Sequence, residues 1–284
     1  MIDELDLQTA LEKLGVNKDV IIDENQNVLW THRSLPGMDI YFLTNQSDEE
    51  INFTPSFRVS GMKPQLWDAV TGEIRPLNEY SAENGRTAVP LKMLVNQSWF
   101  VVFTNQNENI EKGFEKNFPE FKQLQVIDGQ WTVDFQNKAI GPVETVNFET
   151  LKDWSQMEDE KIKYYSGTAI YQSTFELNEL PESDELFINL GDVSVMAKVK
   201  INGADIGGTW MAPFRLKAGE NLKKGTNQLE IEVVNLWRNQ LIKDKFVPVE
   251  KRYTWHLVDD IKEGEELQSS GLLGPVSIET VNRN

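Results

Sequence analysis

Three stretches in the second half of the chain combine aromatic rings with planar polar side chains. Residues 235–240 read Asn-Leu-Trp-Arg-Asn-Gln, residues 252–256 read Arg-Tyr-Thr-Trp-His, and Trp210 precedes Arg215. Proteins bind sugars by stacking an aromatic ring on their C–H faces and by hydrogen bonds from a few planar polar groups. We therefore predict a carbohydrate contact whose candidates are Trp210, Arg215, Asn235, Trp237, Arg238, Asn239, Asp244, Tyr253, Trp255 and His256.

Packing is the alternative for some of these rings. Trp210 and Trp237 are equally compatible with a position in a core or between domains. Tyr253, Trp255 and His256 differ, because they belong to a long segment, residues 243–269, with little strand pattern. Long segments of this kind are more often functional than short ones.

Hydrolysis of a glycosidic bond needs two carboxyl groups about 5–10 Å apart. The acids considered are Asp192, Asp244, Asp259 and Asp260. Because the chain carries 45 acidic residues, most are expected to be simply solvated, and we assign no catalytic residue. Two histidines, His32 and His256, are too few for a His-rich metal site. The metal is therefore unknown and no cofactor is expected. A structural Ca²⁺ on loop oxygens is physically reasonable, but no ligand spacing supports it.

The composition excludes several other classes of function. The 284 residues include no cysteine, so neither a disulfide framework nor a thiol nucleophile is available. A formal net charge of −17 disfavours nucleic acid, and it disfavours strongly anionic glycans unless a local basic patch exists. No apolar run approaches the ~20 residues of a membrane span. The acidic N-terminus lacks signal-peptide features. The chain as given is thus cytoplasmic, or periplasmic or extracellular if it is a fragment of an exported enzyme, and its localisation is left open.

The elements that must position these residues are mostly strands. Apolar spacing predicts one helix over residues 7–14, with Gly15 as its stop. From Val28 onward, short alternating strands and turns favour β-sandwiches, and Asn202-Gly203 is the strongest hairpin signal. Residues 106–116 are polar and are interpreted as a linker. The eight strand–helix units of a (β/α)₈ barrel are not seen.

Seven sequence blocks in the second half suggest a family. They are residues 165–175, 190–193, 199–203, 208–215, 225–233, 235–239 and 270–276. In this order they resemble the sugar-binding jelly roll of glycoside hydrolase family 2 and its relatives, and most closely the C-terminal region of family 106 α-L-rhamnosidase-like enzymes. In the first half, residues 31–33, 39–45, 66–68 and 71–73 resemble the sandwich that follows the catalytic barrel in those enzymes.

The resemblance implies an all-β fold of two β-sandwich domains, the C-terminal one a galactose-binding-like jelly roll, with a short N-terminal helix. It implies three parts: a helix and connecting segment that follows a missing barrel, a first sandwich, and the jelly roll. It also makes His32 and Arg33 barrel-facing candidates, for which a structural pair is the alternative. The chain departs from the family pattern at Gln240, where an Arg is expected, and at Lys243, where a Gly is expected. The three parts are residues 1–36, 37–110 and 111–284.

Three functions remain open from the sequence. The leading hypothesis is a non-catalytic C-terminal portion of a glycoside hydrolase, which packs on a catalytic barrel and contacts oligosaccharide. The second is a free-standing carbohydrate-binding protein, and the third is an intact hydrolase with an unrecognised site. The expected partners are therefore carbohydrate or a catalytic barrel.

Overall fold

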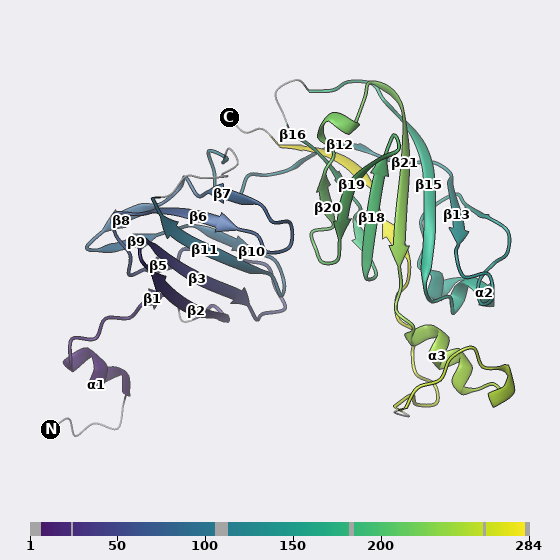
Figure 1. Cartoon of the computed structure of the whole chain (residues 1–284), viewed down its shortest axis with the longest axis horizontal. Coiled ribbons are helices and arrows are strands. Elements are labelled where there is room, and N and C mark those ends of the chain that lie inside the picture. The colour runs from purple at the N-terminus through teal and green to yellow at the C-terminus, as the bar shows by residue number, and fades with distance from the viewer. Residues whose placement is uncertain (1–6, 24, 106–112, 182–184, 258–259, 282–284) are drawn as a thin grey trace. The chain divides into compact units, whose positions relative to one another are not determined.

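The chain folds as two β-sandwich units that divide between Glu120 and Phe121 (Figure 1). This computed structural model describes residues 7–23, 25–105, 113–181, 185–257 and 260–281. Within those ranges the strands form six sheets, all of whose strand pairs are antiparallel, and there are three short α-helices. None of the described helices is long and apolar enough to cross a membrane. The all-β fold of sandwich domains expected from the sequence is confirmed.

The first unit begins with α1 (Leu7–Lys13), which matches the predicted helix. One sheet has the order β2-β3-β11-β6-β7, and the facing strands pair as β1-β5-β9-β8 and β10-β4. Its strands are β1 (Val20–Ile21), β2 (Val28–Leu35), β3 (Met38–Asn45), β4 (Ile51–Phe53), β5 (Ser56–Phe57), β6 (Lys63–Trp67), β7 (Ile74–Pro76), β8 (Ser81–Glu83), β9 (Arg86–Ala88), β10 (Leu91–Met93) and β11 (Ser98–Thr104).

Two segments expected to lie outside the first sandwich are part of it. Strand β2 falls within residues 1–36, yet all eight of its residues pair with β3 across the turn at Gly37, because the two strands form one long hairpin. Residues 113–118 fall within the expected linker and third part. There the Asn78 amide donates to the Phe114 carbonyl at 2.6 Å and the Asn117 amide donates to the Glu79 carbonyl at 2.7 Å. The rest of the expected linker, residues 106–112, lies outside the described residues.

The core of the first unit is formed by side chains at alternating positions of its strands. Along β3 every second residue from Tyr41 onward is buried, and Phe57 and Phe103 pack on Tyr41 with ring centroids 4.7 and 5.9 Å away. Each buried ring of this kind stabilises the fold by about 1.5–3 kcal/mol relative to exposure. The remaining core residues include Leu43, Phe53, Leu66, Leu91, Met93 and Val101.

The second unit packs a sheet of order β12-β23-β16-β20 against one of order β14-β13-β15-β21-β18-β19. Its strands are β12 (Lys122–Val126), β13 (Trp131–Phe135), β14 (Val146–Phe148), β15 (Thr168–Leu177), β16 (Glu185–Asn189), β17 (Asp192–Val193), β18 (Met196–Ile201), β19 (Ala204–Thr209), β20 (Arg215–Lys217), β21 (Gly225–Val234), β22 (Leu272–Gly274) and β23 (Ser277–Val281). The helices are α2 (Glu160–Lys163) and α3 (Arg238–Lys245), with 3₁₀ turns η1 (Trp154–Gln156), η2 (Gly219–Asn221) and η3 (Val249–Lys251).

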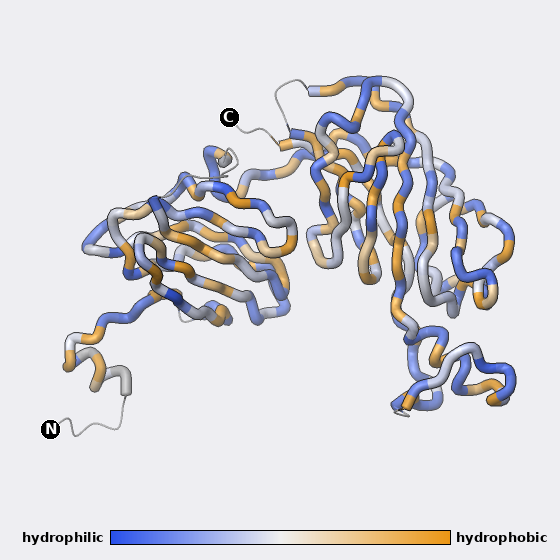
Figure 2. Tube along the Cα trace, viewed as in Figure 1, coloured by the Kyte–Doolittle hydropathy of each residue, from blue (hydrophilic) through white to orange (hydrophobic). Residues whose placement is uncertain are grey.

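The core of the second unit follows the same rule. Buried positions alternate with more exposed ones along β15 and β21, and along β21 Figure 2 shows the alternation of hydrophobic and hydrophilic residues. Behind them lies an aromatic cluster in which Trp154 stacks on Tyr171 and meets Tyr165 edge-on. Gly271 fits against this cluster because it has φ +94° and because a Cβ there would come within 2.6 Å of Trp154.

The predicted hairpin between β18 and β19 is confirmed. Asn202 and Gly203 have φ values of 52° and 84°, the two positive angles of a type I′ turn. The Asn202 amide also donates to Asn227 Oδ1 at 2.9 Å, which ties the turn to the start of β21. Local sequence chemistry and tertiary contacts therefore agree at this turn.

Candidate functional site

Most of the predicted carbohydrate candidates lie in one excursion from the second sandwich. Residues 235–271 leave the end of β21, form α3, and return to β22; we call this segment the arm. Figure 1 shows α3 and the coil after it lying beyond the strand ends, away from the sheet faces. The arm holds Asn235, Trp237, Arg238, Asn239, Asp244, Tyr253, Trp255 and His256, whereas Trp210 and Arg215 lie elsewhere in the unit.

Helix α3 forms from a run of helix-compatible residues, Arg-Asn-Gln-Leu-Ile-Lys-Asp-Lys, directly after β21. Lys243 and Lys245 in its last turn complement the negative end of the helix dipole. The helix ends at Phe246, and Pro248 prevents its continuation. Its buried face is unusual because it is mostly polar: Asn239, Gln240, Ile242 and Asp244.

Asp244 links helix α3 to the later part of the arm. The residue is only 4% exposed, and its carboxylate accepts four hydrogen bonds. Gln240 Nε2 donates to Oδ1 at 2.9 Å; the backbone amides of Tyr253 and Thr254 donate to Oδ2 at 3.1 and 2.7 Å, and Thr254 Oγ1 donates to Oδ2 at 2.6 Å. A buried carboxylate of this kind is stable only when it is hydrogen-bonded in this way. Asp244 therefore folds the segment around Tyr253 back onto α3.

Gln240 and Lys243, where the chain departs from the resembled pattern, both have partners in the second unit. Gln240 supplies the amide that Asp244 Oδ1 accepts. Lys243 places its ammonium 3.4 Å from Glu160 Oε2 and 5.1 Å from the centre of the Tyr164 ring. Both residues thus serve contacts within the second unit.

Asn235 and Asn239 hold the base of the arm. Asn239 Nδ2 donates to the Gln268 carbonyl at 2.7 Å and to Ser270 Oγ at 2.8 Å, while its Oδ1 accepts the Gln268 amide. Asn235 is buried, and its amide donates to the Tyr165 carbonyl at 3.4 Å. Beside them is a polar cavity of about 210 Å³, below the roughly 300–1,000 Å³ of pockets that enclose drug-sized ligands. It is lined by Ser194, Val195, Asn235, Leu236, Asn239, Gln268, Ser269 and Ser270.

The aromatic residues of the arm are exposed. Trp255 is 81% exposed, Tyr253 63% and Trp237 45%. Trp210, in the loop after β19, is 54% exposed, so neither Trp210 nor Trp237 is buried in the core of this unit. His256 is half-buried. Other exposed apolar side chains of the arm are Leu236, Phe246, Val249 and Leu257.

The two candidate arginines of the second unit are held by carboxylates. Arg238 Nη1 lies 3.0 Å from both oxygens of Asp260, and its Nε donates to Glu265 Oε1 at 2.7 Å, which ties α3 to the returning part of the arm. Hydrogen bonds from the Lys262 amide and from Arg238 lower the pKa of Glu265 below its usual value. Arg215 Nε donates to Glu279 Oε2 at 2.6 Å, and its guanidinium lies 3.8 Å from the centre of the Phe121 ring.

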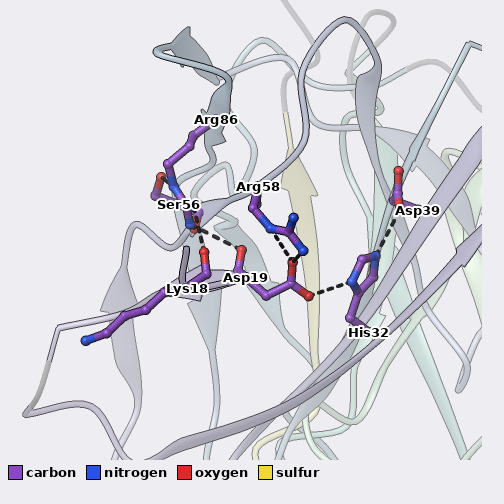
Figure 3. A network of polar contacts seen from close by, with 7 residues as sticks. All are labelled: Lys18, Asp19, His32, Asp39, Ser56, Arg58 and Arg86. Atoms are coloured by element: carbon purple, nitrogen blue, oxygen red, sulfur yellow. Dashed lines mark hydrogen bonds and ion pairs between the residues drawn. The ribbon is translucent and has the colours of Figure 1, made fainter. Parts of the chain in front are cut away.

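In the first unit, the two barrel-facing candidates have different surroundings (Figure 3). His32 Nδ1 lies 2.6 Å from Asp19 Oδ2 and Nε2 lies 2.9 Å from Asp39 Oδ1, and the ring stacks on Tyr41 with centroids 4.1 Å apart. Arg33 is the next residue on β2 and is exposed. His32 therefore belongs to a cluster of carboxylates and a tyrosine and is not paired with Arg33.

This cluster extends through Asp19. Arg58 Nη2 lies 2.8 Å from Asp19 Oδ1, and Arg86 donates to the carbonyls of Lys18, Asp19 and Ser56. Burial, followed by the charges of Asp19 and Asp39, raises the pKa of Tyr41 well above its usual value. Asp19 was not among the predicted site residues, because it lies 13 positions before His32 and no local pattern links the two. The β2–β3 hairpin sets His32 opposite Tyr41 and so could indicate Asp39, but it gives no signal for Asp19.

Comparison with known proteins shows similarity to glycoside hydrolases. Residues 1–82 match the model of glycoside hydrolase family 106, described as alpha-L-rhamnosidase. The solved rhamnosidase of Novosphingobium sp. PP1Y is similar over 97% of this chain, with a TM-score of 0.85 and 32% identity, and the match covers 26% of that protein. A Formosa agariphila protein named "Putative beta-glucuronidase" is 37% identical over 178 residues, which is 54% of this chain and 15% of that protein.

These findings define the chain as a glycoside hydrolase-related protein built from β-sandwich domains. In particular, it is similar to a stretch amounting to about a quarter of the Novosphingobium rhamnosidase, and its first 82 residues match the α-L-rhamnosidase family. The resemblance to family 106 enzymes predicted from the sequence blocks is thereby confirmed. Because the chain spans only 26% and 15% of these two proteins, their activities come to it only as proposals.

Proposed function

We propose that this chain is a non-catalytic, carbohydrate-associated region of an α-L-rhamnosidase-like glycoside hydrolase. In this proposal the second unit is a galactose-binding-like jelly roll whose arm contacts bound oligosaccharide, and the region packs against a catalytic barrel. The observation that carries the proposal is the arm itself, in which a buried carboxylate fixes a segment that exposes Tyr253 and Trp255.

Exposed rings on a fixed backbone support binding. Exposed aromatic and aliphatic side chains that gather on one segment mark interaction sites more often than chance. A segment that is already ordered loses little conformational entropy when it binds, so its contacts translate more fully into affinity. The arm has both properties, because Asp244 pins the amides of Tyr253 and Thr254 while leaving the rings of Tyr253 and Trp255 exposed.

The described carboxylates support a non-catalytic role. Asp244 is occupied by four hydrogen bonds, and Asp260 is paired with Arg238. Asp192 lies in a two-residue strand and is exposed. Asp259 lies outside the described residues. Of the described acids considered for hydrolysis, Asp244 and Asp260 thus stabilise the arm through their hydrogen bonds.

The test is a binding and hydrolysis screen on the full chain. Affinity electrophoresis in rhamnose-containing and uronate-containing polysaccharides should retard the chain, and Trp255→Ala should weaken retention about tenfold, equivalent to about 1.4 kcal/mol. Tyr80→Ala is the matched control, because Tyr80 is an exposed aromatic residue of the first unit. Equal retention of both variants would contradict the arm's role. Release of sugar from aryl glycosides by the pure chain, abolished by changing one acid, would replace the proposal with an intact enzyme.

A further inference from the structure

The tip of the arm carries a positive charge that contrasts with the rest of the chain. Residues 243–256 contain four basic residues and two acidic ones, whereas the whole chain has a formal charge of −17. One of the two acids, Asp244, is buried and hydrogen-bonded within the arm. Lys243 is paired with Glu160 and Lys245 is half-buried. The exposed charges of the tip are therefore those of Lys251 and Arg252, with Glu250 as the one exposed acid, and their sum is positive.

Arg252 is the most strongly oriented of these cations. Its Nε donates to the Val247 carbonyl at 3.0 Å, and its Nη2 donates to the Lys245 carbonyl at 3.2 Å. Both acceptors are neutral, so these bonds fix the guanidinium without cancelling its charge. An arginine has five N–H donors, and the three that remain include one on Nη2 and both on Nη1. The edge of the guanidinium formed by Nη1 and Nη2 is thus left to hold a carboxylate with two parallel hydrogen bonds.

Two aromatic residues follow this cation closely in the chain. Arg252 has extended backbone angles at the end of η3, and Tyr253 and Trp255 follow it. The amides of Tyr253 and Thr254 donate to Asp244, which fixes the backbone there. Residues 252–255 therefore carry a guanidinium, a phenol and an indole on an ordered segment. Lys251 is exposed next to Arg252 and adds charge of the same sign.

We propose that the arm binds a uronic acid residue of an acidic oligosaccharide. Arg252 holds the sugar carboxylate, and Tyr253 and Trp255 pack against the pyranose ring. A uronic acid matches these three side chains. The guanidinium can donate two parallel hydrogen bonds to the planar carboxylate, and the aromatic rings can stack on the C–H face of the sugar. This inference rests on the proposed function and narrows its ligand to a class of sugar.

The experiment measures binding of the full chain to matched pairs of glycans. Oligomers of galacturonate, glucuronate, and mannuronate with guluronate are each compared with the same oligomer after reduction of its carboxyl groups to alcohols. At 20 mM NaCl we expect at least one uronate oligomer to bind tenfold or more tightly than its reduced partner. We also expect this preference to shrink at 300 mM NaCl, because exposed charges are screened.

Two variants distinguish paired hydrogen bonds from the Arg252 guanidinium from a nonspecific attraction to positive charge. Arg252→Lys keeps the charge but removes the paired hydrogen bonds, and it should lower affinity for the uronate about fivefold without changing affinity for the reduced oligomer. Lys224→Gln, an exposed cation of the same unit outside the arm, is the control and should change neither. If Arg252→Lys binds the uronate as the wild type does, the paired hydrogen bonds are not used and the proposal fails.

The outcomes also distinguish this inference from the proposed function. Equal binding of uronate and reduced oligomers would overturn the inference and leave a neutral-sugar contact. Binding to none of the oligomers, together with no retention in the polysaccharide screen, would overturn both. Unchanged near-ultraviolet circular dichroism of Arg252→Lys would verify that the arm remains folded.

Discussion

The His32 cluster and the arm both combine carboxylates with aromatic rings, but the ring is covered in the cluster and the rings are exposed in the arm. In the cluster, Asp19 and Asp39 face the two nitrogens of His32, whose ring is covered by Tyr41. In the arm, the carboxylate of Asp244 faces backbone amides, and the aromatic rings beside it remain exposed. The difference lies in the backbone bonds: Asp244 accepts from two backbone amides as well as from two side chains, and so fixes a segment whose rings stay exposed, whereas the carboxylates of Asp19 and Asp39 meet side chains around a covered ring.

Removing the carboxylate of the arm tests this contrast most strongly. Asp244→Ala leaves the amides of Tyr253 and Thr254 without their acceptor, and we expect it to destabilise the folded arm by about 3 kcal/mol. Hydrogen exchange should show loss of protection at those two amides. Asp192→Ala, which changes an exposed acid, is the control and should leave them protected. Retained protection in Asp244→Ala would mean that other contacts hold the arm.

Opening the His32 cluster should have the next largest effect. His32→Ala removes the donor between two carboxylates and the stack on Tyr41, and we expect a loss of about 2 kcal/mol in the free energy of unfolding measured with urea. Arg33→Ala, one residue along the same strand but exposed, should change it by less than about 0.5 kcal/mol. Similar decreases in the free energy of unfolding of both variants would contradict the structural role assigned to His32 alone.

Removing a ring from the arm should cost almost no stability. Trp255 is 81% exposed, so Trp255→Ala should change the free energy of unfolding by less than about 0.5 kcal/mol in the same urea titration. Its effect is expected on glycan retention alone. A loss as large as that of His32→Ala would show that Trp255 is a packing residue, and the contrast between the two regions would fail.

The smallest expected effect is a response of the arm to acid. The pKa of Glu265 is lowered in the folded chain, so its contact with Arg238 stabilises the arm above the unfolded pKa of glutamate. That contribution is lost as the pH falls through the lower folded pKa. The protection factors of the amides between residues 260 and 268, which are corrected for the pH dependence of intrinsic exchange, should therefore fall at acid pH, and Glu265→Gln should show this lower protection already at pH 7.

Strand alternation and turn chemistry made much of the fold predictable. The helix at residues 7–14 and the Asn202-Gly203 hairpin both arise from local preferences that the tertiary structure does not override. The limits of the first sandwich were harder to predict. The pairing of β2 and the docking of Asn117 on Glu79 depend on residues far apart in sequence.

The site was predictable as a region but not in its internal roles. The polar and aromatic pattern of the arm pointed to a binding segment, and the exposure of Tyr253 and Trp255 fits that expectation. Asp244, Asn235 and Asn239 share the same stretch, yet their hydrogen bonds go to groups within the second unit. Sequence alone does not show which way a polar side chain turns, because that depends on partners 4 to 70 positions away.

The bridge that Asp244 makes between α3 and the Tyr253 segment couples two events. Fraying of the helix releases the segment that carries the rings, so any ligand that prefers the ordered rings must also favour the intact helix. By thermodynamic reciprocity, the helix then influences ligand affinity by the same factor as the ligand influences the helix. A glycan bound at Trp255 should accordingly slow hydrogen exchange at the Leu241 amide, which donates to the Trp237 carbonyl at 2.9 Å in the first turn of α3. The helix would thus act as a reporter of occupancy at a surface that it does not itself form.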